Sequence, residues 1–431
     1  MSSKIPRQEV TRPDRPWRRI APAAFAPALL LTLLGCGEDT MSPAVPDKAG
    51  APALATTAIL SFAQMSAGGH HTCGVTTANK AYCWGSNGNG QLGDGTTSPR
   101  LRPVPVAGGL LFLRVSAGQV HTCGITTTNR AYCWGGNGDG QVGDGTQNTN
   151  RLKPVAVAGG RSYGQVSAGP SHTCAVTTAD VAFCWGSNEL GKLGNPFSLT
   201  GFNRLTPLRV SGGLHFQQVI AGALHTCGAT TGNQGYCWGA NGNGELGTGT
   251  ATGSSAPVPV AGGLHFRMVV AGGGLILIPS EEQEGGYSCG LTTDNLAYCW
   301  GEKPFGGVSF TPVAIPGGRH FRGLNLSHGH VCAVTLADLA FCWGRNNAGQ
   351  LGDGTILSRS TPVRVTGGLH FLAVTTNGFS QHSCGITTDR LGYCWGLNQQ
   401  GQLGVGTSTG PEACQLGVPC STKPSGVKSP I

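Results

Sequence analysis

Seven pairs of cysteines, each spaced by ten positions, recur along the 431-residue chain. In every copy the second cysteine is followed by Trp-Gly. Two thiols at a fixed spacing can be oxidised to a disulfide where the compartment is oxidising. The pairs are Cys73 and Cys83, Cys123 and Cys133, Cys174 and Cys184, Cys227 and Cys237, Cys289 and Cys299, Cys332 and Cys342, and Cys384 and Cys394.

The residues around each pair predict a β-hairpin. In the first copy, residues 71–76 and 81–84 are rich in β-branched and aromatic residues and flank a short polar turn. A three-residue loop closing at Asn79 would place Cys73 directly opposite Cys83, with Cα atoms about 4.5 Å apart. This separation lies at the short end of the disulfide range, so we expect all seven pairs to be disulfides within their own hairpins.

The hairpin turns share one residue type at the position six after the first cysteine. Six copies have Asn or Asp there, which tolerate the left-handed backbone that closes such a loop, and Arg390 departs from the pattern in the seventh. The residue after the first cysteine is Gly or Ala, and it should face the Tyr or Phe before the second, as Gly74 faces Tyr82. Both faces are therefore apolar or small, which predicts a sheet buried on both sides.

A histidine stands two positions before the first cysteine in six copies, and a tyrosine replaces it in the fifth. A metal site would require several imidazoles around one ion. One imidazole per repeat around a ring would keep them far apart, so we interpret each as hydrogen-bonding within its own repeat. The residues are His71, His121, His172, His225, His330 and His382, with Tyr287 in the fifth copy.

Asp-Gly-Thr loops containing Asp94, Asp144 and Asp353 could be considered as calcium ligands. Calcium favours six to eight oxygen ligands, and no second carboxylate is close in the sequence, so a turn role is the better interpretation. The chain has no nucleophile elbow, phosphate-binding loop or zinc-protease motif. We therefore predict no catalytic residues, no metal site, no cofactor and no enzyme activity.

The elements that carry these residues repeat about every fifty positions. A full unit, clearest in the second copy, consists of a predicted strand, two hairpin strands, a glycine-rich loop and a fourth strand that begins with Pro-Val. Four strands repeated seven times predict an all-β, seven-bladed β-propeller of four-stranded antiparallel blades. We expect the C-terminal tail, residues 421–431, to pair into the first blade and close the ring, and Cys414–Cys420 to form an eighth disulfide.

The repeats resemble the regulator of chromosome condensation repeat family. The resemblance rests on Val-Ser-Ala-Gly-x-x-His-Thr-Cys, on Tyr-Cys-Trp-Gly, and on Gln-Leu-Gly-Asp-Gly-Thr, as in residues 91–96 and 350–355. It covers about residues 59–431. It implies a seven-bladed propeller. It also implies a choice among several activities: nucleotide exchange on a small GTPase, ultraviolet sensing, or β-lactamase inhibition in secreted bacterial relatives. The cysteines at the two hairpin positions distinguish this chain from the intracellular members, which usually have other residues there.

The N-terminal segment predicts export. Residues 1–35 hold six of the 28 basic and two of the 20 acidic residues, so half of the formal charge of +8 lies there and nucleic-acid binding is not indicated. The apolar run 20–34 is too short for a stable span and ends in Leu-Leu-Gly-Cys36, which resembles a bacterial lipobox. We predict a lipoprotein-type signal peptide at 1–35, lipid on Cys36, a flexible tether at 36–57 and the propeller at 58–431.

The fifth repeat departs from the others. It inserts residues 272–286 before its hairpin and replaces the long glycine-rich loop with residues 302–307. Because binding residues are often found on loops held by a rigid scaffold, we consider the insertion a candidate partner-binding loop, against the alternative of a tolerated surface insertion. Its candidate contact residues are Leu275, Ile276, Leu277, Ile278, Glu281, Glu282 and Glu284.

The sequence thus predicts a non-catalytic binding scaffold for a protein or peptide partner, held by its lipid at a bacterial envelope, at the outer membrane or the cell surface. It would be secreted if the lipobox is not used. Two alternatives stay open: an inhibitor of a secreted or periplasmic enzyme, such as a β-lactamase, and a hydrolase or lyase with its site at the propeller channel.

Overall fold

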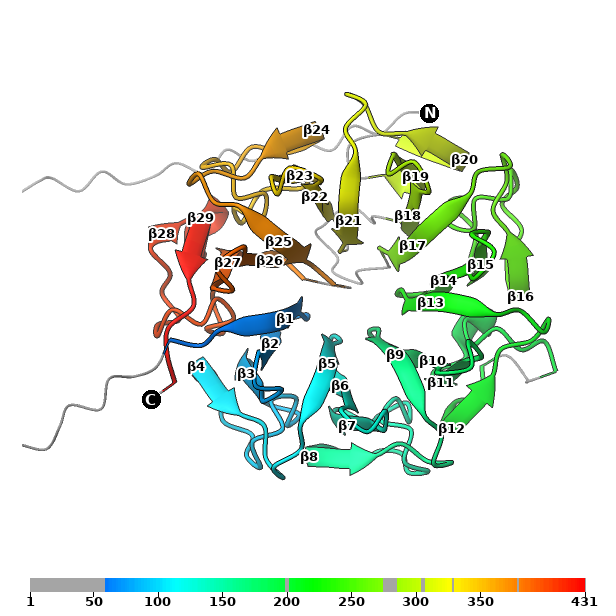
Figure 1. The fold of residues 1–431 in the computed structure, drawn as a ribbon, viewed down its shortest axis with the longest axis horizontal. Coiled ribbons are helices and arrows are strands. Elements are labelled where there is room, and N and C mark those ends of the chain that lie inside the picture. Colours follow the sequence, from blue (N-terminus) through cyan, green and yellow to red (C-terminus); the bar gives the residue numbers. More distant parts are fainter. Residues whose placement is uncertain are drawn as a thin grey trace, which may run out of the picture. The chain divides into compact units, whose positions relative to one another are not determined.

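The computed structural model describes residues 59–197, 201–273, 285–303, 307–327, 329–377 and 380–430, all within one unit, Thr56–Ile431. This part of the chain forms seven antiparallel sheets around a central axis (Figure 1). The predicted seven-bladed β-propeller is confirmed, and we number the blades 1 to 7 in chain order. The predicted signal peptide, tether and Cys36 lie outside the described residues, as do the seven candidate residues from Leu275 to Glu284.

Each blade contributes one strand to each of four concentric positions. The innermost strands are β1 Phe62–Ala67, β5 Phe112–Ala117, β9 Tyr163–Ala168, β13 Phe216–Ala221, β17 Phe266–Gly272, β21 Phe321–Leu326 and β25 Phe371–Thr375. The second strands are β2 His71–Thr76, β6 His121–Thr126, β10 His172–Thr177, β14 His225–Thr230, β18 Tyr287–Thr292, β22 His330–Thr335 and β26 His382–Thr387. Together they form the inner half of every blade.

The third strands complete the hairpins, and the fourth lie at the rim. The third strands are β3 Ala81–Gly85, β7 Ala131–Gly135, β11 Ala182–Gly186, β15 Gly235–Gly239, β19 Ala297–Lys303, β23 Ala340–Gly344 and β27 Gly392–Leu397. The outer strands are β4 Arg100–Pro105, β8 Arg151–Ala156, β12 Arg204–Arg209, β16 Ser254–Pro259, β20 Gly307–Ala314, β24 Arg359–Arg364 and β29 Pro419–Gly426, with β28 Glu412–Ala413 beyond β29. Two short 3-10 helices, Glu189–Gly191 and Gln415–Gly417, lie in loops, and no helix of the described part is long and apolar enough to cross a membrane.

The hairpin register agrees with the sequence prediction. Cys73 lies opposite Cys83 and Gly74 opposite Tyr82, and the other six hairpins repeat this pairing. The turn residue has a positive φ of 60° to 66° in all seven copies, and Arg390, at 65°, adopts it as the Asn and Asp residues do. All residues of β2 are buried, as expected for a sheet covered on both faces.

Disulfides join the two central strands of every blade. Their Cα atoms lie 4.0 to 4.1 Å apart, slightly closer than the 4.5 Å typical of a non-hydrogen-bonded pair. Each bond lies within one hairpin, as the sequence predicts, and none links two blades. The seven bonds are Cys73–Cys83, Cys123–Cys133, Cys174–Cys184, Cys227–Cys237, Cys289–Cys299, Cys332–Cys342 and Cys384–Cys394. An eighth disulfide, Cys414–Cys420, bridges the last connection.

The small residue after the first cysteine has a different role from the one expected. A Cβ at Gly74 would lie 2.7 Å from the ring of Phe62, which belongs to the innermost strand of the same blade. The ring that needs this space is therefore that of Phe62, and not that of Tyr82 on the neighbouring strand.

The predicted pairing of the C-terminal tail with blade 1 is wrong. The tail strand β29 pairs with β27 and completes blade 7, because β4 already fills the outer position of blade 1. Blades 7 and 1 are instead joined by a hydrogen bond from Phe62 N to Arg390 O of 2.8 Å and by a shared apolar cluster. Val427, beyond the tail strand, packs against that cluster.

The hydrophobic core lies between neighbouring blades. One cluster combines Cys73, Val75 and Cys83 of blade 1 with Phe112 and Trp134 of blade 2. The cluster between blades 7 and 1 contains the residues at the equivalent positions. Each disulfide therefore packs within an interface between blades. A blade cannot bury its faces alone, which is why a closed ring is needed.

Candidate functional site

A buried hydrogen-bond relay connects six of the seven pairs of neighbouring blades at the level of the hairpin disulfides. Between blades 1 and 2, His71 Nε2 lies 2.8 Å from Thr122 Oγ1, and the Thr122 hydroxyl donates to Gln91 O at 2.8 Å. Gln91 belongs to the glycine-rich loop of blade 1. The prediction that each histidine hydrogen-bonds within its own repeat is therefore wrong for the Nε2 bond, whose partner lies in the following blade. It holds for the other ring nitrogen of His330 and His382, whose Nδ1 atoms lie 2.7 Å from Ser327 Oγ and 3.0 Å from Ser380 Oγ of their own blades.

The same joint is present six times around the ring. In each, a histidine meets a Thr or Ser hydroxyl of the next blade, at 2.8 to 2.9 Å. The pairs are His71–Thr122, His121–Thr173, His172–Thr226, His225–Ser288, His330–Ser383 and His382–Thr72, the last of which joins blade 7 to blade 1.

The geometry fixes the protonation of these histidines. The hydroxyl donates its proton to the loop carbonyl, which can only accept, so the imidazole must donate to the hydroxyl from Nε2. Burial lowers the pKa of His71, His121, His225 and His330 to about 3 and that of His172 and His382 well below 6.5. Each joint therefore holds a neutral imidazole at neutral pH.

A tryptophan uses the same loop carbonyl. Trp134 Nε1 donates to Gln91 O at 3.0 Å, and five other tryptophans make the equivalent bond. The loop approaches so closely that a Cβ at Gly93 would lie 2.7 Å from Trp134 Nε1, which is why glycine is needed there. One carbonyl thus accepts from a hydroxyl and an indole of the neighbouring blade, and both donors are buried.

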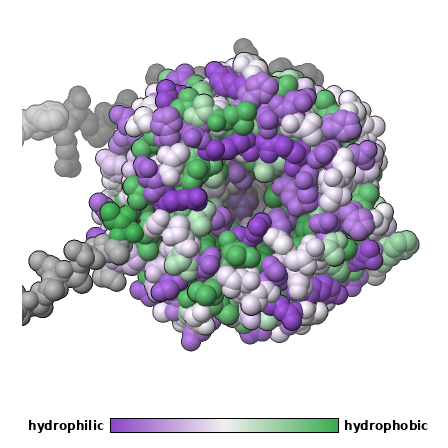
Figure 2. All heavy atoms as spheres, in the orientation of Figure 1, coloured by the Kyte–Doolittle hydropathy of each residue, from purple (hydrophilic) through white to green (hydrophobic). Residues whose placement is uncertain are grey.

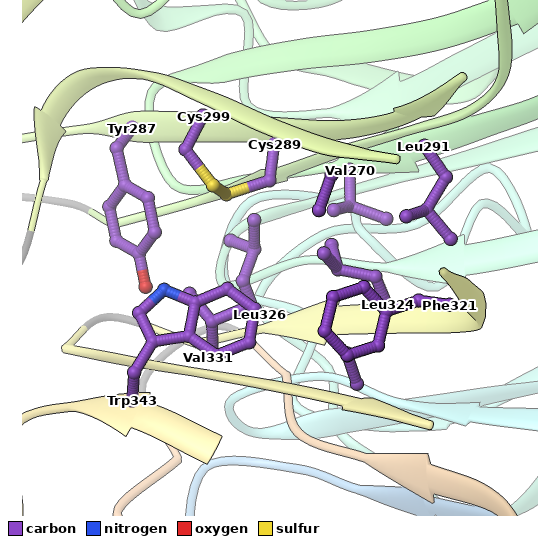
Figure 3. Packing of buried hydrophobic residues seen from close by; sticks show 12 residues of the cluster. Val270, Tyr287, Cys289, Leu291, Cys299, Phe321, Leu324, Leu326, Val331 and Trp343 are labelled. Atoms are coloured by element: carbon purple, nitrogen blue, oxygen red, sulfur yellow. A yellow bond between two sulfur atoms is a disulfide. The ribbon is translucent and has the colours of Figure 1, made fainter. Parts of the chain in front are cut away.

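The joint between blades 5 and 6 is built differently (Figure 3). Tyr287 replaces the histidine, and Val331 stands where the other blades carry Thr or Ser. The Tyr287 hydroxyl donates to Ser327 O at 2.8 Å and to His330 O at 3.2 Å. Tyr287, Val331 and Trp343 belong to one apolar cluster between the two blades.

The glycine-rich loop of blade 5 is also missing. The strands β19 and β20 pair directly, with Glu302 opposite Val308 and Lys303 opposite Gly307, where the other blades insert the Gly-Gln-Leu-Gly segment. Gly285 N, at the end of the fifth repeat's insertion, donates to Glu302 Oε2 at 2.8 Å. Three changes, in the loop, the histidine and the hydroxyl, therefore coincide at one joint.

Two charged residues occupy the glutamine position of the loops on blades 3 and 4. Lys192 is 1% exposed, and its Nζ donates to Ser171 Oγ at 2.9 Å and to Ala223 O at 3.3 Å. Burial lowers the pKa of Lys192, and burial likewise raises the pKa of Glu245. Their backbone carbonyls still accept the relay bonds, so the side chain varies while the joint is preserved.

The central channel is a hollow of about 510 Å³ lined by the innermost strands (Figure 2). Side-chain amides connect neighbouring strands across it. Gln64 Nε2 donates to Val115 O at 3.0 Å, and Val115 N donates back to Gln64 Oε1 at 2.9 Å. The side-chain amide of Asn377, in blade 7, donates to the carbonyl of Ala117 in blade 2 and to that of Ala168 in blade 3. The polar groups of the channel wall thus largely hold the ring together.

The aspartates of the glycine-rich loops have the turn role that the sequence predicts. Asp94 Oδ1 accepts from Thr96 N at 2.9 Å, and Oδ2 accepts from Arg100 Nε at 2.8 Å. Burial raises the pKa of Asp94, but the hydrogen bonds from Thr96 and Arg100 outweigh burial and leave it lowered. Among the described residues, no group of three His, Cys, Asp or Glu side chains is placed to hold a metal ion.

Sequence reasoning missed the hydroxyl partner of the histidines. The position before the first cysteine is Thr or Ser in six copies and Val331 only in the copy that follows Tyr287. This matched exception was visible in the sequence. It was missed because each repeat was considered alone, whereas the contact joins two repeats.

Comparison with known proteins agrees with the fold and the repeat. The profile of the regulator of chromosome condensation (RCC1) repeat matches residues 79–125, 129–176, 180–229, 234–278 and 338–387, more than half of the chain. The chain belongs to the RCC1 repeat family. Members of this family are generally non-catalytic binding or regulatory propellers. The matched ranges stop at 278 and resume at 338, which brackets most of the atypical blade 5.

Individual relatives are distant. The chain is 26% identical to the ultraviolet-B receptor UVR8 of Arabidopsis thaliana over 375 residues, 80% of this chain and 79% of that protein. It is 30% identical to the probable E3 ubiquitin-protein ligase HERC4 of Homo sapiens over 206 residues, 46% of this chain but 19% of that protein.

Solved structures show the same fold. Prp20p of Saccharomyces cerevisiae aligns with a TM-score of 0.67 at 17% identity, covering 86% of this chain and 87% of that one. Human WBSCR16 aligns with a TM-score of 0.64 at 20% identity, covering 74% and 85%.

Proposed function

We propose that this RCC1-repeat propeller is an exported, non-catalytic scaffold that binds a protein partner and is held at the cell envelope by lipid on Cys36. In this proposal residues 1–35 are the signal peptide, 36–57 the tether and 58–431 the propeller. Eight disulfides are typical of an oxidising extracellular or envelope compartment and support export. The lipid and the membrane in which it sits rest on the sequence around Cys36 alone.

The observation that carries the binding role is the single atypical joint. Six joints repeat one buried hydrogen-bond pattern. The seventh combines a shortened loop, Tyr287 and an insertion, all in blade 5, with Val331 in blade 6. A propeller of this fold, Prp20, has been crystallised with Kap60, and Prp20p has binding properties to Gsp1p and histones. Protein binding by the ring is therefore the role that the family and the local asymmetry favour together.

We place the partner contact at blade 5. Leu275, Ile276, Leu277 and Ile278 would form its apolar centre, and Glu281, Glu282 and Glu284 an acidic rim. The hydrogen bond from Gly285 N, near the end of the insertion, to Glu302 Oε2 of β19 supports an insertion that is anchored on blade 5. This contact is a proposal from the sequence and from that anchoring bond.

Affinity capture from envelope extract tests the proposal. The wild type is compared with a variant whose residues 275–284 are replaced by a short Gly/Ser loop, and with a control whose exposed loop residues 147–150 of blade 2 are replaced in the same way. We expect the wild type and the control to recover the same partner and the blade 5 variant to lose it at an unchanged melting temperature. Unchanged capture by the folded blade 5 variant would contradict this location.

The identity and activity of the captured protein separate the open alternatives. An enzyme that is recovered and silenced would identify the chain as an inhibitor, of a β-lactamase or of another secreted enzyme. Turnover of generic hydrolase or lyase substrates by the purified propeller would instead contradict the non-catalytic role.

The anchor is tested by Cys36→Ser. We expect the substituted protein to be released from the membrane fraction or to retain its leader. A variant that fractionates and migrates like the wild type would show that Cys36 carries no lipid.

A further inference from the structure

Blades 3 and 6 share a group of three residues that the other blades lack. At the position before the second cysteine, five blades have Tyr, whereas these two have Phe183 and Phe341. Opposite the phenylalanine on the outer strand stands an arginine, Arg209 or Arg364, where the other blades have Pro, Ala or Gly. Two blades therefore change the same two positions together.

A second arginine accompanies each phenylalanine. The guanidinium carbon of Arg161 lies 4.4 Å from the centroid of the Phe183 ring, and that of Arg319 lies 4.7 Å from the centroid of Phe341. The equivalent residue of the other five blades is leucine: Leu60, Leu110, Leu214, Leu264 and Leu369. Replacing a packed leucine by arginine adds a charge without being needed for the fold, since leucine serves the same position elsewhere.

In blade 3 these residues line a hollow at the rim of the ring. Arg161, Phe183 and Arg209 form it with Ser162, Thr177 and Thr178, and its volume is about 420 Å³. Arg209 is exposed and Arg161 is half-buried against the ring. A guanidinium that stacks on an aromatic face keeps its N–H edge free for a planar, bidentate acceptor.

The charge around this hollow is mostly positive. Arg130 of the preceding blade donates to Gly160 O, and it pairs with Ser162 through an isolated β-bridge. Asp180, in the hairpin turn, is the nearby acid on the same blade. Two arginines in the lining of the hollow, together with serine and threonine hydroxyls in the same lining, are a donor set suited to a carboxylate.

We propose that the hollow formed by Arg161, Phe183 and Arg209 of blade 3 binds the carboxylate side chain of an acidic polypeptide segment. One guanidinium donates two parallel hydrogen bonds to the carboxylate, the second adds a positive charge beside it, and the Phe183 ring contacts the aliphatic part of the Glu or Asp side chain. The site deepens the proposed scaffold function, on which it rests, by giving the chemistry of a second contact on the partner.

Blade 6 provides an internal comparison. It repeats the ring and both arginines as Phe341, Arg319 and Arg364, but Leu336, which is 58% exposed, replaces Thr178. His320 replaces Ser162, and its Nδ1 is bonded to Asp294 O at 2.8 Å. Blade 6 therefore keeps both arginines but has fewer hydroxyl donors, and Leu296 of the preceding blade stands where blade 3 has Arg130 beside it. We therefore assign the carboxylate site to blade 3.

The test measures binding of a fluorescent octaglutamate peptide by anisotropy at low salt, with octaglutamine as the neutral control. We expect octaglutamate to bind and octaglutamine not to bind. The R161L/R209A variant should weaken octaglutamate binding about tenfold or more, because both guanidinium partners are removed. The matched R319L/R364A variant of blade 6 should stay within about twofold of the wild type.

Both variants install residues that sister blades already carry, so folding is expected to be preserved, and thermal melting verifies it. Octaglutamate binding that is absent, or that falls equally in the two variants, would overturn the proposal. Tighter binding of an eight-residue oligothymidylate than of octaglutamate would overturn it in favour of nucleic acid. None of these results bears on capture of the envelope partner through blade 5, so the two proposals fail separately.

Discussion

The six regular joints and the joint between blades 5 and 6 solve the same problem with different groups. In a regular joint, a loop carbonyl accepts from a hydroxyl that in turn accepts from histidine, as Gln91 O, Thr122 and His71 show. At blades 5 and 6, Tyr287 reaches the backbone carbonyls of Ser327 and His330 directly. Both arrangements give a hydrogen-bond partner to the polar groups that meet across the joint, but only the regular one needs the glycine-rich loop.

The difference shows that the three changes depend on one another. Without the loop of blade 5, a hydroxyl at position 331 would lose its usual acceptor, and a buried unpaired hydroxyl costs about 1–3 kcal/mol. Valine avoids that cost, and a histidine at position 287 would then have no hydroxyl to donate to. Tyrosine, which is longer, finds acceptors further away. A shortened loop therefore explains both substitutions, and the joint stays closed while the blade's loops are free to differ.

Acidification should give the largest effect, because it protonates the histidines of all six regular joints, whereas the Tyr287 hydroxyl at the joint between blades 5 and 6 does not take up a proton. The folded state holds these imidazoles neutral, with pKa values of about 3 for four of them, whereas unfolded histidine takes up a proton below about pH 6.5. Stability should therefore be constant above about pH 6.5 and fall as the pH drops toward 3, by up to about 1.4 kcal/mol per pH unit for each histidine. Urea unfolding at a series of pH values measures the slope.

The control for acidification is the double variant His71→Tyr with Thr122→Val, which copies the atypical joint into a regular one. In this variant the free energy of unfolding should fall less steeply with decreasing pH, by about the contribution of one histidine. A stability that does not change between about pH 6.5 and pH 4 would contradict the buried, neutral state of the joints.

The second largest loss of stability is expected when one hairpin disulfide is removed. Replacing Cys123 and Cys133 by alanine in blade 2 should lower the free energy of unfolding by somewhat under about 3 kcal/mol, the chain-entropy value for so short a loop. The matched replacement of Cys289 and Cys299 in blade 5 should cost the same, because both hairpins span ten residues and share one register. A much smaller loss in blade 5 would show that its hairpin, and not only its joint, differs. Peptide mapping without reduction verifies the other pairings.

Exchanging the hydroxyl and the valine should destabilise the protein in both directions. Thr122→Val leaves His71 without its acceptor, and Val331→Thr buries a hydroxyl where the loop is missing, so each should cost about 1–3 kcal/mol. Denaturant unfolding of both variants measures this. A neutral or stabilising Val331→Thr would mean that the loop and the hydroxyl are not coupled.

The smallest effect is expected at the seventh hairpin turn. Arg390 has φ of 65°, a conformation that Asn adopts more easily, and four sister turns carry Asn at this position. Arg390→Asn should raise the free energy of unfolding by a few tenths to about 1 kcal/mol. Thermal melting compares this variant with Asn129→Arg, whose melting temperature should shift in the opposite direction. The comparison distinguishes an effect of the turn from an effect of surface charge.

Structural features that lie within one repeat could be predicted from the sequence. The hairpin register, the positive-φ turn at Asn79 and the facing cysteines follow from alternation and turn chemistry within fifteen residues. Contacts between repeats were not predicted, because an isolated repeat does not show which neighbour lies beside it. His71 was therefore given a partner in its own blade, and Gly74 was matched to Tyr82, although Phe62 fills the space.

The end of the chain was misplaced for a related reason. The tail was expected in blade 1 because no Pro-Val strand precedes Ile59, yet blade 1 obtains its outer strand, β4, from residues that follow its own hairpin. Which strand completes which blade depends on where the repeat begins, and periodicity alone does not fix that starting point. The charged hollow of blade 3 was also not foreseen, since its arginines come from two segments 48 residues apart.

The most direct test of the joints is the tautomer and titration of the histidines, read from imidazole nitrogen chemical shifts in isotope-labelled protein. We predict that His71, His121, His172, His225, His330 and His382 carry the proton on Nε2 and stay neutral as the pH falls below about 6.5. His71, His121, His225 and His330, with pKa values of about 3, should stay neutral to about pH 4. Protonation of these six near pH 6.5, or a proton on Nδ1, would contradict the relay of histidine, hydroxyl and carbonyl that connects the blades.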